Sequence, residues 1–394
     1  MRILIYSWEF PPFFNGGLGV HVAELTPRLA EAEVAMHVIT QTHESTQLYD
    51  NPQPNLFIHR VDTSHINNDG NIYDLAKQVN PLLEETGNKL WQELNGFDII
   101  HVHDWLVGFA GICLKNSHAC PLLTTFHATE KGRYRSPTLH NGLSQSINQT
   151  EQNLANESDK IIVCSQFMLR EVSDLFGVPA EKMVVIPNGI NLPSHSYSQE
   201  EVAEFREEHL SAQAPLIFSI GRLVFEKGYH VLIGAMPQVL EEFPQAKLII
   251  AGKGPEFNHL NTIAQNLNIS DHVHLPGFIS EEERIKFLLA ASCTVFPSLY
   301  EPFGIVALEG MVFQKPVIAS RVGGMAEIIE HEKTGILMDS DSSDSAAWCI
   351  INTLQNPVLA QARVANAYRL VEKKYSWRSI AENTKVVYED MVEI

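Results

Sequence analysis

The 394-residue sequence has few cysteines, no long apolar run and no excess of positive charge. Its five cysteines are scattered and form no CxxC pair, so reduced, buried thiols are expected rather than a disulfide framework. No apolar run approaches the 18 residues of a membrane-spanning helix. The apolar start, residues 1–7, turns polar too early for a signal peptide. We therefore expect a cytoplasmic protein without stable membrane insertion.

The net charge of −19 is spread evenly along the chain. Residues 1–190 carry 12 Lys and Arg against 21 Asp and Glu, and residues 191–394 carry 16 against 26. Neither half offers a basic face for nucleic acid or for an anionic membrane, so an anionic ligand would need a few local cations. With 45% hydrophobic and 19% charged residues the composition is globular, and the length fits two domains.

Short β-branched runs alternate with helix-length amphipathic stretches along the whole chain. Strands that are apolar on both faces and separated by helices are typical of parallel sheets covered by helices on both sides. The pattern restarts near residue 215, which predicts an α/β fold of two doubly wound domains. The expected strands are Ile3–Ser7, Ala35–Thr40, Leu56–Val61, Ile99–His103, Leu122–Phe126, Ile161–Ser165, Val184–Ile186, Leu216–Ile220, Lys247–Ala251, Val273–Leu275, Thr294–Pro297, Val317–Ala319 and Gly335–Met338.

The domain boundary is expected at Pro187–Asn191, because Pro, Asn and Gly end a strand and begin an irregular linker. This gives domains of residues 1–190 and 191–376. The remaining run, Trp377–Val392, has apolar residues at helical spacing, and its simplest interpretation is a helix that caps the second domain. Ligands of open parallel sheets bind beyond the carboxyl ends of the strands, so the loops that follow the strands are the candidate sites.

The loop after the first strand contains Gly16, Gly17 and Gly19, which permit positive φ and a close approach of a ligand to the backbone. The helix that follows would offer free N–H groups to an anion. The spacing is not GxGxxG, so a nicotinamide-type dinucleotide is disfavoured. A phosphate or sugar contact and a plain structural turn both fit this loop.

The strand at residues 99–103 ends in two histidines on one face, His101 and His103, followed by Asp104. A metal ion is one interpretation, because imidazole and carboxylate groups are common metal ligands. No later His, Asp or Cys cluster clearly completes such a site. No metal is therefore expected, and a polar strand end that faces a cleft is favoured.

His127 follows the strand at residues 122–126, where its ring could donate a hydrogen bond to a substrate hydroxyl. Three cations, Lys131, Arg133 and Arg135, come next within five residues, which is unusual in so acidic a chain. They indicate either an anionic group on the substrate or a solvated loop paired with Glu130.

Arg222 and Lys227 flank a tight loop between a strand and a helix in the second half. Arg presents a fork of donors to phosphate oxygens, and Lys presents a mobile point charge. Together they could neutralise a diphosphate. The alternative is a surface ion pair of Lys227 with Glu226.

The segment at residues 298–310 is the most specific feature of the sequence. Glu301 follows a strand, and the N–H groups around Phe303, Gly304 and Ile305 would open a helix at the cleft. Glu309 lies about 7.5 Å from Gly304 along the helix axis. Each carboxylate could accept hydrogen bonds from the vicinal hydroxyls of a sugar ring. The acid/base pair of a glycosidase and an ordinary helix-face role for Glu309 are the competing interpretations.

Taken together, these segments resemble the retaining nucleotide-sugar glycosyltransferases of the GT-B fold, and within them family 4 and the glycogen- and starch-synthase-like group. The resemblance implies two Rossmann-like domains that face each other across a cleft, with a final helix within 377–394 that packs back on the first. The matching motifs, in the family's order over nearly the whole chain, are EFPPFFNGGLG, HVHDW, TFHATEKGR, VCSQFM, VIPNGIN, GRLVFEKG, AGKGP, LPGFIS, FPSLYEPFGIVALEG and VGGMAEII.

The resemblance also implies the roles of individual residues. Arg222 and Lys227 would bind the donor diphosphate and stabilise it as it leaves. Glu301 would hold a hydroxyl of the donor sugar. His127 would contact the transferred sugar near the reacting centre, and Asp104 would lie beside the acceptor.

The remaining implied contacts belong to donor binding. Backbone groups of Phe303, Gly304 and Ile305 would contact the donor sugar, Glu309 would hold the ribose hydroxyls, and Gly17 would approach the phosphates. The implied reaction transfers a sugar, glucose foremost, from an ADP- or UDP-sugar to an acceptor hydroxyl with retention of configuration. It needs no metal and no cofactor.

Several alternatives remain open within and beyond this family. An α-glucan is one acceptor, and a small, phosphorylated or lipid-linked acceptor is the alternative. The synthases typically carry a Lys just before the paired glycines, where this chain has Phe14 and Asn15, so one expected cation is missing. The rival functions are a nucleotide-sugar epimerase of the same fold, a donor-binding protein and a metal hydrolase built on His101 and His103.

Overall fold

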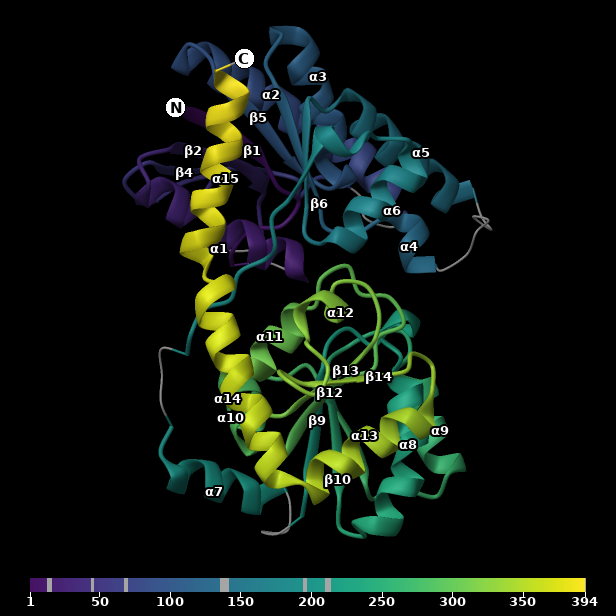
Figure 1. The fold of residues 1–394 in the computed structure, drawn as a ribbon. Helices are drawn as coiled ribbons and strands as arrows, with labels where there is room; N and C mark the ends of the chain where they lie inside the picture. The colour runs from purple at the N-terminus through teal and green to yellow at the C-terminus, as the bar shows by residue number, and fades with distance from the viewer. Residues whose placement is uncertain are drawn as a thin grey trace. The chain divides into compact units, whose positions relative to one another are not determined.

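The computed structural model describes residues 1–12, 16–43, 46–66, 70–134, 142–193, 197–209 and 214–393. It divides the chain into two compact units. Unit 1 consists of Met1–Gly189 and Trp377–Ile394, and unit 2 consists of Ile190–Ser376. Each unit is a sheet with helices packed on it (Figure 1), which confirms the predicted fold of two doubly wound α/β domains.

Unit 1 is built on an eight-stranded sheet of order β3-β4-β2-β1-β5-β6-β7-β8. All neighbouring strands are parallel except β3 and β4. The central strands are apolar and buried on both faces, as the sequence pattern requires of a covered parallel sheet. The strands are β1 (Arg2–Tyr6), β2 (Ala35–Gln41), β3 (Tyr49–Gln53), β4 (Leu56–Val61), β5 (Ile99–His103), β6 (Leu122–Phe126), β7 (Lys160–Val163) and β8 (Met183–Val185).

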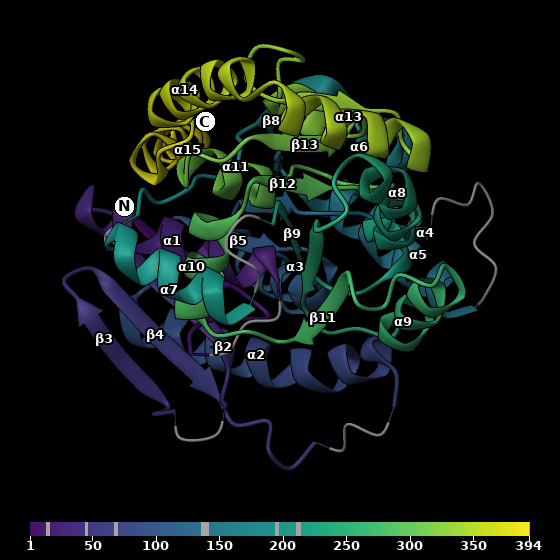
Figure 2. The same ribbon diagram turned by 90° about the horizontal axis from the view of Figure 1, so that it is seen from below.

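Strand β3 is absent from the predicted elements. Its sequence, YDNPQ, is polar, and four of its five residues are exposed. It runs antiparallel to β4 at the edge of the sheet (Figure 2), where a proline is tolerated. No apolar alternation marks such an edge strand, because its side chains do not enter the core.

The helices of unit 1 include one from the far C-terminus of the chain, α15. This helix spans the predicted Trp377–Val392 and packs along α1 (Figure 1). Its residues Trp377, Ile380 and Tyr388 are buried in the core beneath β1 and β5, so the interpretation of this run as a cap on the second domain is wrong. The other helices are α1 (Gly17–Glu31), α2 (Ile72–Leu94), η1 (Trp105–Val107), α3 (Gly108–His118), α4 (Glu130–Tyr134), α5 (Gly142–Glu157), α6 (Gln166–Phe176) and η2 (Ala180–Lys182).

Unit 2 has a six-stranded parallel sheet of order β11-β10-β9-β12-β13-β14. Its strands are β9 (Leu216–Ile220), β10 (Lys247–Ala251), β11 (Val273–Gly277), β12 (Cys293–Phe296), β13 (Val317–Ser320) and β14 (Ile336–Met338). Its helices are α7 (Gln199–His209), η3 (Phe225–Lys227), α8 (Tyr229–Glu242), α9 (Phe257–Asn266), α10 (Glu281–Ala290), α11 (Ile305–Val312), α12 (Met325–Ile328), α13 (Ser343–Gln355) and α14 (Pro357–Lys374).

The strand orders locate the candidate sites. In unit 2, β9 lies between β10 and β12, and in unit 1, β1 lies between β2 and β5. After each of these strands the chain continues to the neighbouring strand on one side, and it later returns to form the neighbouring strand on the other side. At such a switch point the loops after two adjacent strands separate and leave room for a ligand at the carboxyl edge.

Candidate functional site

The loop after β9 in unit 2 is held firmly against the loop after β12. Gly228, the residue just before α8, has φ of +66°, and a Cβ there would lie 2.1 Å from the carbonyl oxygen of Pro297. From the other loop, the backbone N–H of Leu299 donates to the carbonyl oxygen of Glu226 at 2.8 Å. Only glycine fits this contact, and the contact fixes the side chains that both loops carry.

Lys227 and Glu301 meet across these two loops. The Nζ of Lys227 donates to Oε2 of Glu301 at 2.6 Å, and the Oγ of Ser298 donates to the same oxygen at 3.3 Å. The two charged side chains are only 21% and 11% exposed. The alternative pairing of Lys227 with its neighbour Glu226 is not the one that the structure has.

Arg222 occupies a different position at the same edge. Its side chain is 54% exposed, and its guanidinium lies 3.9 Å from the carboxylate of Glu226. An exposed pair at this distance is weak. The structure therefore leaves this guanidinium largely open to solvent in the loop that follows β9.

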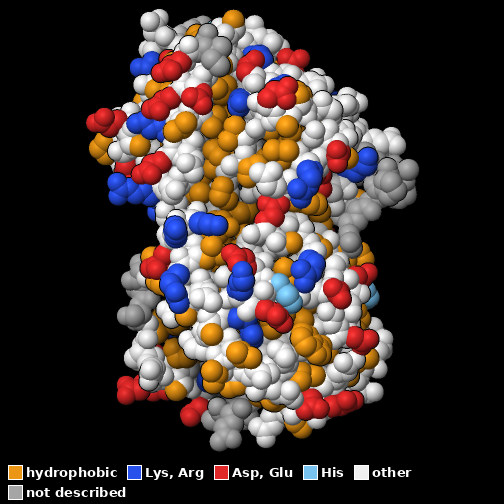
Figure 3. Space-filling model, viewed as in Figure 1, with side chains coloured by type: hydrophobic (Ala, Val, Ile, Leu, Met, Phe, Trp, Pro, Cys, Tyr) orange, Lys and Arg blue, Asp and Glu red, His pale blue; other side chains and the backbone are white. Residues whose placement is uncertain are grey.

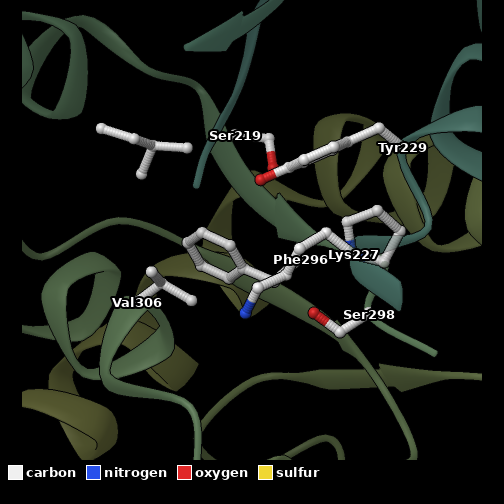
Figure 4. A pocket seen from close by; sticks show the side chains of 8 residues that line it. Ser219, Lys227, Tyr229, Phe296, Ser298 and Val306 are labelled. Atoms are coloured by element: carbon white, nitrogen blue, oxygen red, sulfur yellow. The ribbon is translucent and has the colours of Figure 1, made fainter. Parts of the chain in front are cut away.

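A small pocket opens beside Lys227, seen in Figure 4. The aromatic rings of Tyr229 and Phe296 form its apolar wall. Burial raises the pKa of the Tyr229 hydroxyl, and the charge of Glu301 raises it further, so this group stays protonated. The remaining lining residues are Ser219, Ile220, Pro297, Ser298 and Val306.

The N-terminus of α11 lies next to Glu301. Gly304 precedes the helix with φ of +112°, and no side chain caps it within the described part of the chain. The backbone N–H of Gly324 donates to the carbonyl oxygen of Glu301 at 2.9 Å, and a Cβ on Gly324 would lie 2.4 Å from Cα of Phe303. The N–H groups at the start of α11, which include that of Ile305, carry the positive end of the helix dipole.

Glu309 lies further along α11, and no interaction among the described residues joins it to Glu301. It pairs instead with Arg284 of α10, whose Nη1 lies 3.0 Å from Oε1 of Glu309. Burial raises the pKa of Glu309, and the charge of Arg284 opposes this rise. The other end of Arg284 is held by Glu281, to which its Nε donates at 2.8 Å. The sequence analysis did not identify Arg284, because nothing local in the sequence links α10 to α11.

In unit 1, Asp104 and His127 lie at the ends of adjacent strands, β5 and β6. The backbone N–H of His127 donates to Oδ1 of Asp104 at 2.7 Å. Asp104 has positive φ, +59°. Burial raises the pKa of its carboxyl to about 6, while the charge of Arg133 and backbone hydrogen bonds lower it. The structure thus brings these two predicted residues together.

His127 also lies close to two other histidines, His103 and His21. Nδ1 of His103 and Nε2 of His127 share a hydrogen bond of 3.0 Å, and His21 of α1 lies edge-on to the His127 ring. Nδ1 of His21 donates to Oδ1 of Asn188 at 2.7 Å. Burial lowers the pKa of His21 and of His127 to about 3, so both rings are neutral. The sequence analysis did not identify His21 or Asn188.

His101 is not part of a polar strand end that faces a cleft, and this prediction is wrong. The residue is fully buried, with Nδ1 hydrogen-bonded to the hydroxyl of Tyr388 in α15 and Nε2 to the hydroxyl of Thr125, both at 2.8 Å. Both ring nitrogens are used inside the core. Its side chain therefore links α15 to the sheet.

The glycines of the loop after β1 do not use the positive φ that they permit. Gly16 is extended, with φ of −169°, and Gly17 is the first residue of α1, which also contains Gly19. None of the three has positive φ. Gly17 therefore lies at a helix N-terminus, while Phe14, Asn15 and Arg135 lie outside the described residues.

The surface charges and the helices bear on the predicted partners. On the face seen in Figure 3, Lys and Arg side chains are interspersed with Asp and Glu and form no continuous basic area. Among the described helices, none has the length and apolar character needed to cross a bilayer.

Comparison with known families and proteins identifies both units. Residues 15–193 match Glycosyltransferase Family 4, and residues 201–370 match Glycosyl transferases group 1. The chain is 34% identical to an uncharacterized glycosyltransferase of Methanocaldococcus jannaschii, with 100% of this chain and 99% of that protein covered. It is 31% identical to the glycogen synthase of Mycobacterium tuberculosis, with 98% and 94% covered.

Solved structures agree with this assignment. The sucrose-phosphate synthase of Thermosynechococcus elongatus superposes with a TM-score of 0.85 and 25% identity, over 99% of this chain and 98% of that one. HepE of Anabaena, solved in complex with UDP-glucose, superposes with a TM-score of 0.78 and 22% identity, over 99% and 100%. The chain therefore belongs to the glycogen-synthase-like glycosyltransferases of the GT-B fold.

Proposed function

We propose that this protein transfers glucose, with retention of configuration, from a nucleoside diphosphate glucose to a hydroxyl of an α-glucan. The observation that carries the proposal is the arrangement in unit 2, where Lys227, Glu301 and the N-terminus of α11 lie together at the carboxyl edge of β9 and β12. Cations and free N–H groups suit an anionic diphosphate, and a carboxylate suits sugar hydroxyls.

The leaving diphosphate gains negative charge as the anomeric bond breaks. Lys227 and Arg222 are two cations at this edge, and the first N–H groups of α11, around Phe303, Gly304 and Ile305, add fixed positive dipoles. Groups positioned before the reaction stabilise this charge without reorganisation. On this mechanism neither a metal ion nor another cofactor is required.

The carboxylates take the hydroxyl groups of the donor. Glu301 accepts from a hydroxyl of the transferred glucose, and Glu309, oriented by Arg284, accepts from the ribose. In unit 1, His127 contacts the transferred sugar, Asp104 lies beside the acceptor, and Gly17 approaches the phosphates through the N-terminus of α1.

The donor is a UDP- or ADP-sugar. The UDP-glucose complex of HepE and the name of the glycogen synthase relative support a nucleotide-linked glucose for a protein of this family. A second candidate acceptor is a phosphorylated sugar, favoured by Lys131 and Arg133 after β6 and by the likeness to a sucrose-phosphate synthase.

The test has two stages. Release of nucleoside diphosphate is first measured with ADP-, UDP- and GDP-glucose, and the active donor is then offered with glycogen, with small sugars, with sugar phosphates and with lipid-linked acceptors. Elongated glycogen with α-linkages by NMR, and undiminished activity in a chelator, support the proposal. A new sugar epimer formed without any acceptor would identify an epimerase instead, and donor binding without release of nucleoside diphosphate would identify a binding protein.

A further inference from the structure

Three imidazoles converge in unit 1 from three different elements. His21 comes from α1, His103 ends β5 and His127 follows β6. One ring nitrogen of each lies within 4.8 Å of the other two. His21 and His103 are buried, at 3% and 0% exposure. Buried imidazoles brought together from separate elements are the donor set of many transition-metal sites.

The spacing of the nitrogens is close to that of a metal site. Two nitrogens bound to one zinc ion at about 2.0–2.1 Å in a tetrahedral arrangement are about 3.3–3.4 Å apart. Nδ1 of His103 and Nε2 of His127 are 3.0 Å apart in a hydrogen bond, so metal binding releases the shared proton and turns both rings toward the ion. One ring nitrogen of His21 lies within 4.8 Å of a nitrogen of each other ring, so this spacing has to shorten by at most about 1.5 Å.

The surrounding groups orient His21 in the way that metal ligands are oriented. Its Nδ1 donates to Oδ1 of Asn188 at 2.7 Å, which leaves Nε2 without a proton. A metal-bound histidine typically donates its other ring N–H to an oxygen of a neighbouring group. Nε2 of His103 is buried and has no hydrogen-bond partner in the described part of the chain, so binding through Nδ1 leaves this ring without the acceptor that His21 has. His101 is excluded as a ligand, because Thr125 and Tyr388 engage both of its nitrogens.

We propose that His21, His103 and His127 form a three-histidine site for a borderline transition cation, zinc foremost. Cobalt and nickel ions suit the same imidazole ligands, whereas magnesium and calcium prefer oxygen ligands. Three protein ligands leave a fourth position open to water. His127 is also the proposed sugar contact, so the bound ion should inhibit transfer. This inhibition rests on the proposed function, whereas the metal site does not rest on it.

The site is tested directly with cobalt ions, which absorb visible light when they are bound in this way. The full chain is titrated with Co²⁺ alone, and Zn²⁺ is then added to displace it. His21→Gln and His103→Gln should each weaken binding at least tenfold. His59→Gln is the matched control, because His59 pairs with His37 at 3.2 Å in another partly buried histidine pair and should leave binding unchanged. Thermal unfolding without metal verifies that each variant folds.

Asn188 provides a variant that keeps all three imidazoles. Asn188→Leu removes the acceptor of His21 and should weaken Co²⁺ binding about tenfold, while Asn188→Asp should strengthen it. Wild-type protein that binds no Co²⁺ below millimolar concentration overturns the proposal, as does wild-type affinity in His21→Gln and Asn188→Leu. In the transfer assay Zn²⁺ should inhibit reversibly and Mg²⁺ should not. If the protein has no transferase activity, the cobalt spectrum still reports the site.

Discussion

Replacing Lys227 by Met separates the two roles that this ammonium group can have. In the structure it donates to Glu301 at 2.6 Å, so it is part of an ion pair inside the protein as well as a cation for the proposed diphosphate. If it stabilises the leaving diphosphate, its loss should lower kcat/KM for the donor by about 100- to 1,000-fold, as the loss of a preorganised donor does elsewhere.

The same substitution has a structural cost. The Glu301 side chain is only 11% exposed, and without Lys227 the hydroxyl of Ser298 is its one remaining hydrogen-bond partner among the described residues. Leaving a buried polar group unsatisfied costs about 1–3 kcal/mol of unfolding free energy, and more when the group is charged. Replacing Glu301 by Gln in the same chain removes the unpaired charge. The double variant should therefore regain most of the stability but none of the turnover.

Two measurements on the same preparations decide the matter. Urea unfolding gives the free energy of unfolding, and the rate of nucleoside diphosphate release gives turnover with the active donor. Lys333→Met is the matched control, because Lys333 pairs with Glu330 at 3.3 Å on an exposed surface, and it should change neither quantity. A rate within threefold of wild type in Lys227→Met would refute the reasoning, and so would a double variant that recovers turnover together with stability.

Three further predictions test the elements around this site. Gly228→Ala should lower the free energy of unfolding by about 2 kcal/mol or more, and clearly more than Gly177→Ala, which has similar positive φ but no atom within 4 Å of the added Cβ; thermal unfolding compares them. Burial lowers the pKa of Lys315 to about 8, so the native state releases this proton before the unfolded state, and stability should rise from pH 8 to 10 by an amount that Lys315→Met removes in urea unfolding. Arg284→Ala should raise the pKa of Glu309 further and increase the KM for the donor about tenfold, more at pH 6 than at pH 8 in initial-rate assays.

The backbone of both units could be predicted from the sequence to a large extent. Strands such as β5, β6, β9 and β10 have the predicted bounds, because a buried parallel strand is a short apolar run that ends at polar or glycine residues. Strand β3 could not be predicted in the same way, since an exposed edge strand needs no apolar side chains. A hydrophobic pattern indicates which segments are buried, so it predicts the buried strands and misses the exposed one.

The partners of the charged and polar side chains could not be predicted. Lys227 pairs with Glu301, 74 residues away, and not with its neighbour Glu226, because Gly228 lets the β9–α8 loop contact the loop after β12. His101 and His103 lie on one face of β5, as the sequence predicts. Helix α15, however, covers His101, and the hydroxyl of its Tyr388 forms a hydrogen bond with the His101 ring in the core. In both examples the decisive contact comes from an element that is distant in the sequence.

The distribution of charge in unit 2 bears on how the proposed donor is held. Three cations near the switch point face carboxylates: Lys227 faces Glu301, Arg222 faces Glu226, and Arg284 faces Glu309 as well as Glu281. A fourth, Lys253 after β10, lies over the ring of Phe278. These four cations and four carboxylates leave no local excess of positive charge, and the whole chain carries −19. Long-range attraction therefore contributes little to the capture of a diphosphate. Affinity has to come from short-range groups that are already in position, namely the N–H groups of α11 and the ammonium group of Lys227. The close contacts at Gly228 and Gly324, which leave no room for a Cβ, hold these groups in place.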